Sequence, residues 1–158
     1  MAGRKPKPSN IHALHGHPGK RSLPKREPKP RAGIPKPPAR IADNPTALAV
    51  WEEFAAELNE MQVLTLADRA ALAALVSAYC DWLAADEAIG THGLTQERGS
   101  EINGFYEAAR PEVAIRSDAW KRYKSMLIEF GLTPSARTRV ATNPNSKANP
   151  LEDFLSDG

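Results

Sequence analysis

Residues 16–22 contain the residue types of a loop that binds phosphate. They read Gly-His-Pro-Gly-Lys-Arg-Ser. A nucleotide-binding P-loop needs four residues between its glycines and a Ser or Thr directly after the Lys. Here two residues separate Gly16 from Gly19, Arg21 follows Lys20, and prolines flank the segment. The spacing argues against nucleotide binding and favours a turn that presents Lys20 and Arg21 to phosphates.

Other residue types that carry chemistry form no catalytic arrangement. His12, His15 and His17 could bind a metal, but a stable site needs closed geometry and supporting residues around the ligands. We therefore expect no metal and no cofactor. Cys80 lies in an apolar run and is expected to be a small core residue. No Ser/His/Asp or Cys/His pattern is present, so the sequence predicts that the chain is not an enzyme.

Acidic residues cluster in the middle of the chain, where they could in principle form paired carboxylates. Because they fall at surface positions of expected helices, we interpret them as solvated faces. The residues concerned are Glu52, Glu53, Glu57, Glu60, Asp81, Asp86 and Glu87.

Charge is strongly segregated along the chain, although the net charge is only +2. Residues 1–44 hold eleven Lys and Arg against two acids, whereas residues 45–107 hold two basic residues against eleven acids. Residues 108–140 carry +4 and residues 141–158 carry −2. A flexible cationic segment suits a polyanion, because each phosphate it neutralises releases counterions. The asymmetry therefore favours nucleic acid as a partner over a general role in solubility or binding of an acidic protein.

The candidate DNA-binding residues lie in this basic segment and in a short helix near residue 137. They are Arg4, Lys5, Lys7, Lys20, Arg21, Lys25, Arg26, Arg137 and Arg139.

Composition limits the class of protein further. A chain of 158 residues suits one domain of about 100 residues plus tails. One cysteine excludes an internal disulfide, and no apolar run approaches the roughly 20 residues that cross a bilayer. The basic, Pro-rich start has no apolar core of a secretory signal. We expect a soluble intracellular protein that does not contact membranes.

Hydrophobic spacing predicts an all-α fold: a long helical hairpin core with flanking shorter helices. Asn44 and Pro45 are expected to begin a first helix, and Thr65 and Asp68 a second that ends at Gly90. Further helices are expected over 111–130 and 133–140, with a loop or small hairpin in residues 90–104. The domain plan is thus a basic arm (1–44) that is disordered or extended, a helical oligomerisation core (45–140), and a flexible linker with an acidic-apolar tip (141–158).

The second helix is apolar on both faces. Leucines and aromatics occupy one face, alanines lie mostly on the other, and residues 70–80 carry no charge. A helix that is apolar all round is usually buried all round. Since the other helices can cover only one side, we expect the alanine face to pack against another subunit. The candidate interface residues are Ala67, Ala70, Ala74, Ala78 and Ala85.

Several sequence blocks, in this order, resemble the small subunits of tailed-phage terminases. They are the Gly3-Arg4 opening, the Pro-Gly-Lys-Arg block at residues 18–21, the Tyr79 and Trp82 pair, and the Phe-Gly-Leu-Thr-Pro-x-x-Arg block at residues 130–137. The resemblance covers nearly the whole chain. It departs from the family pattern at His17 and at Gly104, where Asn and Pro respectively are commoner.

The resemblance implies a non-enzymatic part of a viral DNA-packaging motor in the cytoplasm of the bacterial host. Such proteins form rings, bind double-stranded viral DNA where packaging begins, and recruit or regulate the large ATPase and nuclease subunit. The candidate segment for docking to that subunit is the C-terminal tip, through Leu151, Phe154 and Leu155. The alternative is a monomeric RNA-binding or structural nucleoprotein with a basic tail.

Overall fold

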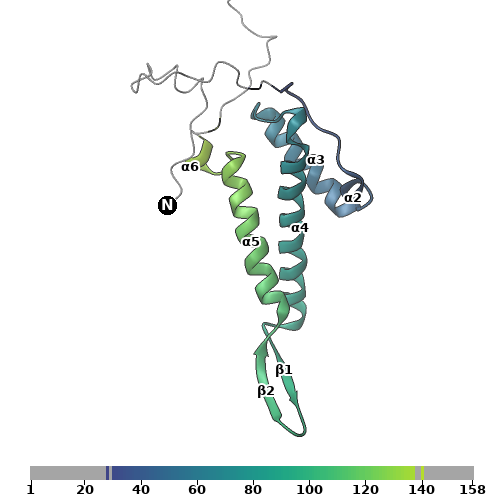
Figure 1. Cartoon of the computed structure of the whole chain (residues 1–158), viewed down its shortest axis with the longest axis vertical. Coiled ribbons are helices and arrows are strands. Elements are labelled where there is room, and N and C mark those ends of the chain that lie inside the picture. The colour runs from purple at the N-terminus through teal and green to yellow at the C-terminus, as the bar shows by residue number, and fades with distance from the viewer. Residues whose placement is uncertain (1–27, 29, 138–139, 141–158) are drawn as a thin grey trace, which may run out of the picture.

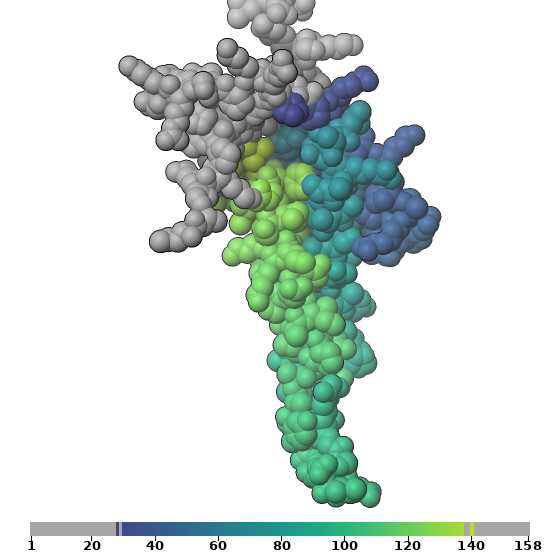
Figure 2. Space-filling model, in the orientation of Figure 1, coloured from purple at the N-terminus to yellow at the C-terminus, as the bar shows by residue number. Residues whose placement is uncertain are grey.

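A computed structural model of the chain describes residues 28, 30–137 and 140. Two long helices, α4 (Arg69–His92) and α5 (Pro111–Glu129), run antiparallel and side by side (Figure 1). The helices α2 (Ala39–Ala42) and α3 (Pro45–Glu60) pack along one half of α4. A β-hairpin extends from the other end, so the molecule tapers towards that tip (Figure 2).

The first long helix begins where the sequence predicts. The Asn44 side chain accepts hydrogen bonds from the backbone N–H groups of Thr46 and Ala47, at 3.1 and 3.2 Å. Pro45 occupies the first helical position, where its missing N–H costs nothing. One face of α3 then buries Trp51 and Leu58 in the core.

The start of α4 is also confirmed. Thr65 donates from its backbone N–H and from its hydroxyl to Asp68 Oδ2, at 2.8 and 2.6 Å. A 3₁₀ turn, η1 (Leu66–Asp68), leads from there into α4. Leu72, Leu75 and Val76 on this helix are fully buried against α3 and the segment before it.

The predicted end of this helix at Gly90 is wrong. The helix continues for two residues beyond Gly90 and stops before Gly93, whose φ of +80° leaves the helical region. The N–H of Gly93 donates to the carbonyl oxygen of Ile89 at 2.8 Å and closes the last turn. Ile89 in this last turn is buried, and an internal glycine costs a helix only about 1 kcal/mol.

The expectation of an all-α chain needs correction, because residues 95–109 form a two-stranded antiparallel sheet. Strands β1 (Thr95–Ser100) and β2 (Gly104–Ala109) pair in the register Thr95↔Ala109 to Ser100↔Gly104. Gly99 fits this hairpin because a Cβ on it would collide with the Gly104 carbonyl oxygen. The small hairpin considered for this region is therefore present, and it begins and ends later than expected.

The C-terminal half of the fold follows the prediction closely. After α5, Gly131 adopts a φ of +74° and Leu132 donates to the carbonyl oxygen of Leu127 at 2.8 Å, which is a Schellman cap. The short helix α6 (Pro134–Arg137) follows. The predicted extension of that helix over residues 138–139 lies outside the described residues, as do residues 141–158.

The basic arm folds in part, which differs from the expectation for residues 1–44. Residues 30–38 run extended beside the α3–α4 connection, and Ala32 bridges Thr65. The N–H of Leu66 donates to the Arg31 carbonyl oxygen at 2.9 Å, and Ile41 in α2 is only 3% exposed. Ile41 supplies the apolar anchor that the composition of the arm as a whole does not suggest.

Candidate interaction surfaces

A groove runs over the alanine side of α4. Its floor is formed by small residues of α4, and its walls come from the α2 region and from α5. Its volume is about 560 Å³. The lining residues are Pro38, Arg40 and Ile41 on one wall, Ala73, Ala74, Ser77 and Ala78 on the floor, and Arg122, Ser125 and Met126 on the other wall.

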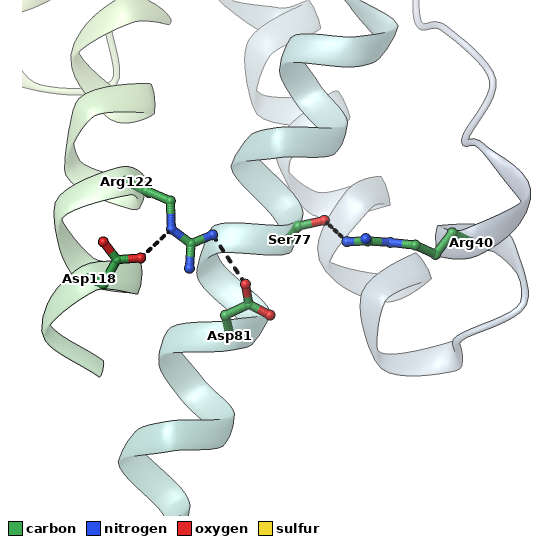
Figure 3. A network of polar contacts seen from close by, with 5 residues as sticks. All are labelled: Arg40, Ser77, Asp81, Asp118 and Arg122. Carbon is green, nitrogen blue, oxygen red and sulfur yellow. Dashed lines mark hydrogen bonds and ion pairs between the residues drawn. The ribbon is translucent and has the colours of Figure 1, made fainter. Parts of the chain in front are cut away.

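Two arginines reach from the α2 and α5 walls of the groove to α4 (Figure 3). Arg40 Nη2 donates to Ser77 Oγ at 2.6 Å and so ties α2 to α4. Arg122 donates through Nε to Asp118 at 2.9 Å and through Nη1 to Asp81 at 3.2 Å, which ties α5 to α4. The hydrogen bond to Asp118 is the main cause that raises the pKa of Arg122. Because these pairs are half exposed, each contributes at most about 1 kcal/mol, and their main effect is to position the groove walls.

An aromatic cluster fills the angle between α3, α4 and α5. Phe54 meets Tyr79 edge-on with ring centroids 5.7 Å apart, and Tyr79 lies 5.2 Å from Tyr123. Trp82 stacks on Tyr123 at 6.3 Å and lies 5.5 Å from Trp120. Burial is the main cause that raises the pKa of Tyr123, and Tyr79, Glu57 and Glu53 add to it. The cluster links the three helices and leaves Trp120 44% exposed at its edge.

The groove and the aromatic cluster occupy opposite sides of the α4–α5 pair. Side chains two positions apart in an α-helix point in directions that differ by about 200° around the helix axis. Ser77 lines the groove while Tyr79 belongs to the cluster, and on α5 Arg122 lines the groove while Trp120 belongs to the cluster. The groove therefore lies on one face of the molecule and the aromatic cluster on the opposite face.

The predicted interface alanines fall into two groups. Ala67, Ala70 and Ala74 are exposed near the start of α4. Ala78 and Ala85 are 2% and 5% exposed, because they already pack within the chain. Of the five predicted alanines, Ala74 and Ala78 line the groove, and Ala67, Ala70 and Ala74 are the three that the fold leaves exposed.

Most of the predicted DNA-binding residues and the whole predicted docking tip lie outside the described residues. This holds for the seven candidates up to Arg26, for Arg139, and for Leu151, Phe154 and Leu155. Arg137 is described and is exposed on α6. The three histidines weighed as metal ligands also lie outside this part of the chain.

Sequence reasoning missed the residues that shape the groove walls. Arg40 belongs to the arm for which the sequence predicts a disordered or extended chain, and its partner Ser77 is 37 residues away. Arg122 is one of several basic residues on α5, and its spacing in the sequence does not single it out. A signal was available for the other face: Trp120 and Tyr123 fall on neighbouring heptad rows of α5, which places them on one side of the helix.

Comparison with known families identifies the chain. A family model described as phage terminase, small subunit, matches residues 47–147, which is more than half of the sequence. The chain belongs to the phage terminase small-subunit family. No curated protein and no solved structure matches it. The matched range includes α4, the hairpin, α5 and α6, so the aromatic cluster and the α4 and α5 sides of the groove lie on family sequence, while its α2 wall lies before the matched range.

Two negative findings apply to the described part of this terminase family member. None of its described helices is long and apolar enough to span a membrane. Within residues 28, 30–137 and 140, no group of three or more His, Cys, Asp or Glu side chains could hold a metal ion. Cys80 is half-buried against the core, and burial raises the pKa of its thiol.

Proposed function

We propose that this chain is the small subunit of a phage terminase, which binds viral DNA at the packaging initiation region and recruits or regulates the large ATPase and nuclease subunit. The observation that carries the proposal is the family match over residues 47–147, joined to a strongly basic N-terminal segment. In this proposal the chain acts in the cytoplasm of the bacterial host and has no catalytic activity of its own.

The basic arm is the proposed main DNA contact. Residues 1–27 hold seven Lys and Arg against one Glu. Contacts of this kind hold a protein on the phosphate backbone and read little sequence. Arg137, exposed on α6, and Arg139 would add two further cationic contacts.

The acidic-apolar C-terminal tip is the proposed docking segment for the large subunit. It reads Leu-Glu-Asp-Phe-Leu and follows a polar linker with two prolines. One turn of amphipathic helix would bring Leu151, Phe154 and Leu155 together, which suits an apolar groove on a partner. Removal of residues 150–158 is expected to abolish co-purification with the large subunit while DNA binding persists.

Self-association is the third part of the proposal. Ala67 in η1 and Ala70 and Ala74 in α4 are exposed small residues, and α4 carries no charge from Ala70 to Cys80. Family members assemble as rings, and the same arrangement is proposed for this chain.

The experiment that tests the DNA-binding proposal is a deletion of residues 2–27. The deleted segment ends before Arg31 and Ile41, so the contacts that these two residues make with the core are kept. Since log K falls by about 0.9 per phosphate contact for each tenfold rise in salt, the deletion should weaken binding to duplex DNA and flatten the salt dependence. Binding is measured by fluorescence anisotropy between 50 and 200 mM salt, roughly the range over which such contacts lose most affinity.

Deletion of residues 141–158 is the matched control, since it removes a tail of comparable length with a net charge of −2. An unchanged affinity and salt slope after deletion of residues 2–27 would contradict the proposal. Preferential competition by structured RNA over packaging-region DNA would favour a nucleoprotein role instead.

A further inference from the structure

We propose that the groove of one chain receives the aromatic face of a second copy, so that subunits join head to tail. Hereafter the aromatic face means the edge of the aromatic cluster at Trp120 with the neighbouring Glu53 and Glu57 of α3. This inference rests on the self-association part of the proposed function and assigns the two surfaces that carry it.

The groove has the shape and lining to accept large side chains. A cavity of about 150 Å³ is enough for benzene, so about 560 Å³ accommodates more than one aromatic ring. On its floor, Ala73, Ala74 and Ala78 contribute only methyl groups, which lets a partner approach the α4 backbone closely beside the hydroxyl of Ser77 that binds Arg40. Ile41 and Met126 add apolar surface to the walls.

The opposite face supplies a matching projection. Trp120 is the outermost ring of the cluster and is 44% exposed, while its contact with Trp82 at 5.5 Å holds it in place. Tryptophan is among the residues that dominate binding energy when they enter a desolvated pocket. A ring that is already fixed loses little conformational entropy on binding.

Charge supports the same pairing. Arg40 on the groove wall is hydrogen-bonded to a hydroxyl, Ser77 Oγ, and to no carboxylate among residues 30–137. Glu53 and Glu57 are exposed beside the aromatic cluster and form no ion pair within that part of the chain. A second copy seated in the groove would bring these opposite charges together at the rim of the contact.

The position of the two surfaces fixes the kind of assembly. The groove and the aromatic face lie on opposite sides of the α4–α5 pair. Two copies therefore cannot each place an aromatic face in the other's groove at the same time, which excludes a two-fold symmetric dimer through these surfaces. Each added copy leaves one free groove and one free aromatic face. Such a heterologous contact continues until it closes into a ring or grows as a filament. A closed ring is the assembly proposed above for this family member.

Two blocking variants test the pairing. Ala74→Glu places a carboxylate on the groove floor, and Trp120→Glu removes the projecting ring. Each variant alone is expected to lose assembly, with the dissociation constant raised at least tenfold and the mass by light scattering falling towards one chain. An equimolar mixture should form a two-chain species and nothing larger, because only one intact groove and one intact aromatic face remain.

Controls separate this outcome from misfolding. Ala84→Glu makes the same substitution at an exposed alanine of α4 outside the groove and should keep the wild-type mass. If Trp120→Glu loses helical circular dichroism, the double variant Glu53→Lys/Glu57→Lys replaces it, since both side chains are exposed.

Wild-type mass in either blocking variant, or a mixture that stays as single chains, would overturn the proposed surfaces while self-association stands. A wild-type chain that is itself a monomer at micromolar concentration would instead contradict the self-association part of the proposed function. DNA binding by the arm is measured independently of both results.

Discussion

Tyr123 is the residue through which the three long helices meet. Its ring contacts Phe54 on α3, Tyr79 and Trp82 on α4, and Trp120 on its own helix. Burial among these rings disfavours the phenolate and raises the pKa of Tyr123. The folded structure therefore favours the neutral phenol of Tyr123 over the phenolate.

The shifted pKa of Tyr123 predicts a loss of stability at alkaline pH. A group with a raised pKa in the folded state stabilises the fold fully below its unfolded value, about pH 10 for tyrosine, and this contribution disappears as pH rises through the folded value. Tyr123→Phe should therefore show a smaller drop in thermal midpoint than the wild type between about pH 9 and pH 11. Tyr106→Phe, at a tyrosine that is 61% exposed on β2, should follow the wild-type curve. Parallel curves for the wild type and Tyr123→Phe would contradict the assignment.

Local residue roles were predictable, and distant pairings were not. Asn44 and Thr65 act as caps with partners no more than three residues away, so the sequence alone identifies them. The Arg40–Ser77 and Arg122–Asp81 pairs join residues 37 and 41 positions apart. No local pattern encodes them, because they exist only once α2, α4 and α5 have packed.

At the scale of the elements, apolar spacing decided what could be predicted. The helices α3, α4 and α5 pack apolar residues at helical spacing against the core, so their period is visible in the sequence and their starts were placed correctly. The hairpin buries almost nothing, with Phe105 and Tyr106 on β2 and Ile102 in the turn all exposed. A strand with no buried face shows no alternation of apolar and polar residues in its sequence. Only the glycine content of this region therefore indicated a hairpin.

The difference between Gly90 and Gly93 gives a prediction for α4. Gly90 lies inside the helix with open space around its Cα, so Gly90→Ala should stabilise the protein by about 1 kcal/mol. Gly93 has a φ of +80° that alanine adopts only with strain, so Gly93→Ala should destabilise it by about 1–3 kcal/mol. Urea unfolding of both variants measures the two signs. Destabilisation by Gly90→Ala would mean that the helix ends there after all.

At the scale of the whole molecule, the fold explains why α4 is apolar on all sides. One side packs on α3 and the N-terminal segment, a second packs on α5, and the groove exposes the alanines between α2 and α5. The sequence predicted that this helix needs more cover than the other helices give. The groove and the aromatic face could not be predicted, since both depend on which sides of α4 and α5 the neighbouring elements leave open.

Sedimentation velocity of the full chain, alone and with a duplex DNA fragment, tests the central claim most directly. The account predicts that the protein alone sediments as a multiple of the chain mass. It also predicts that DNA moves this assembly to a larger species, which dissociates as salt is raised from 50 to 200 mM, about the range in which phosphate contacts weaken most. A single chain that sediments identically with and without DNA would contradict both the assembly of this terminase family member and its role in binding viral DNA.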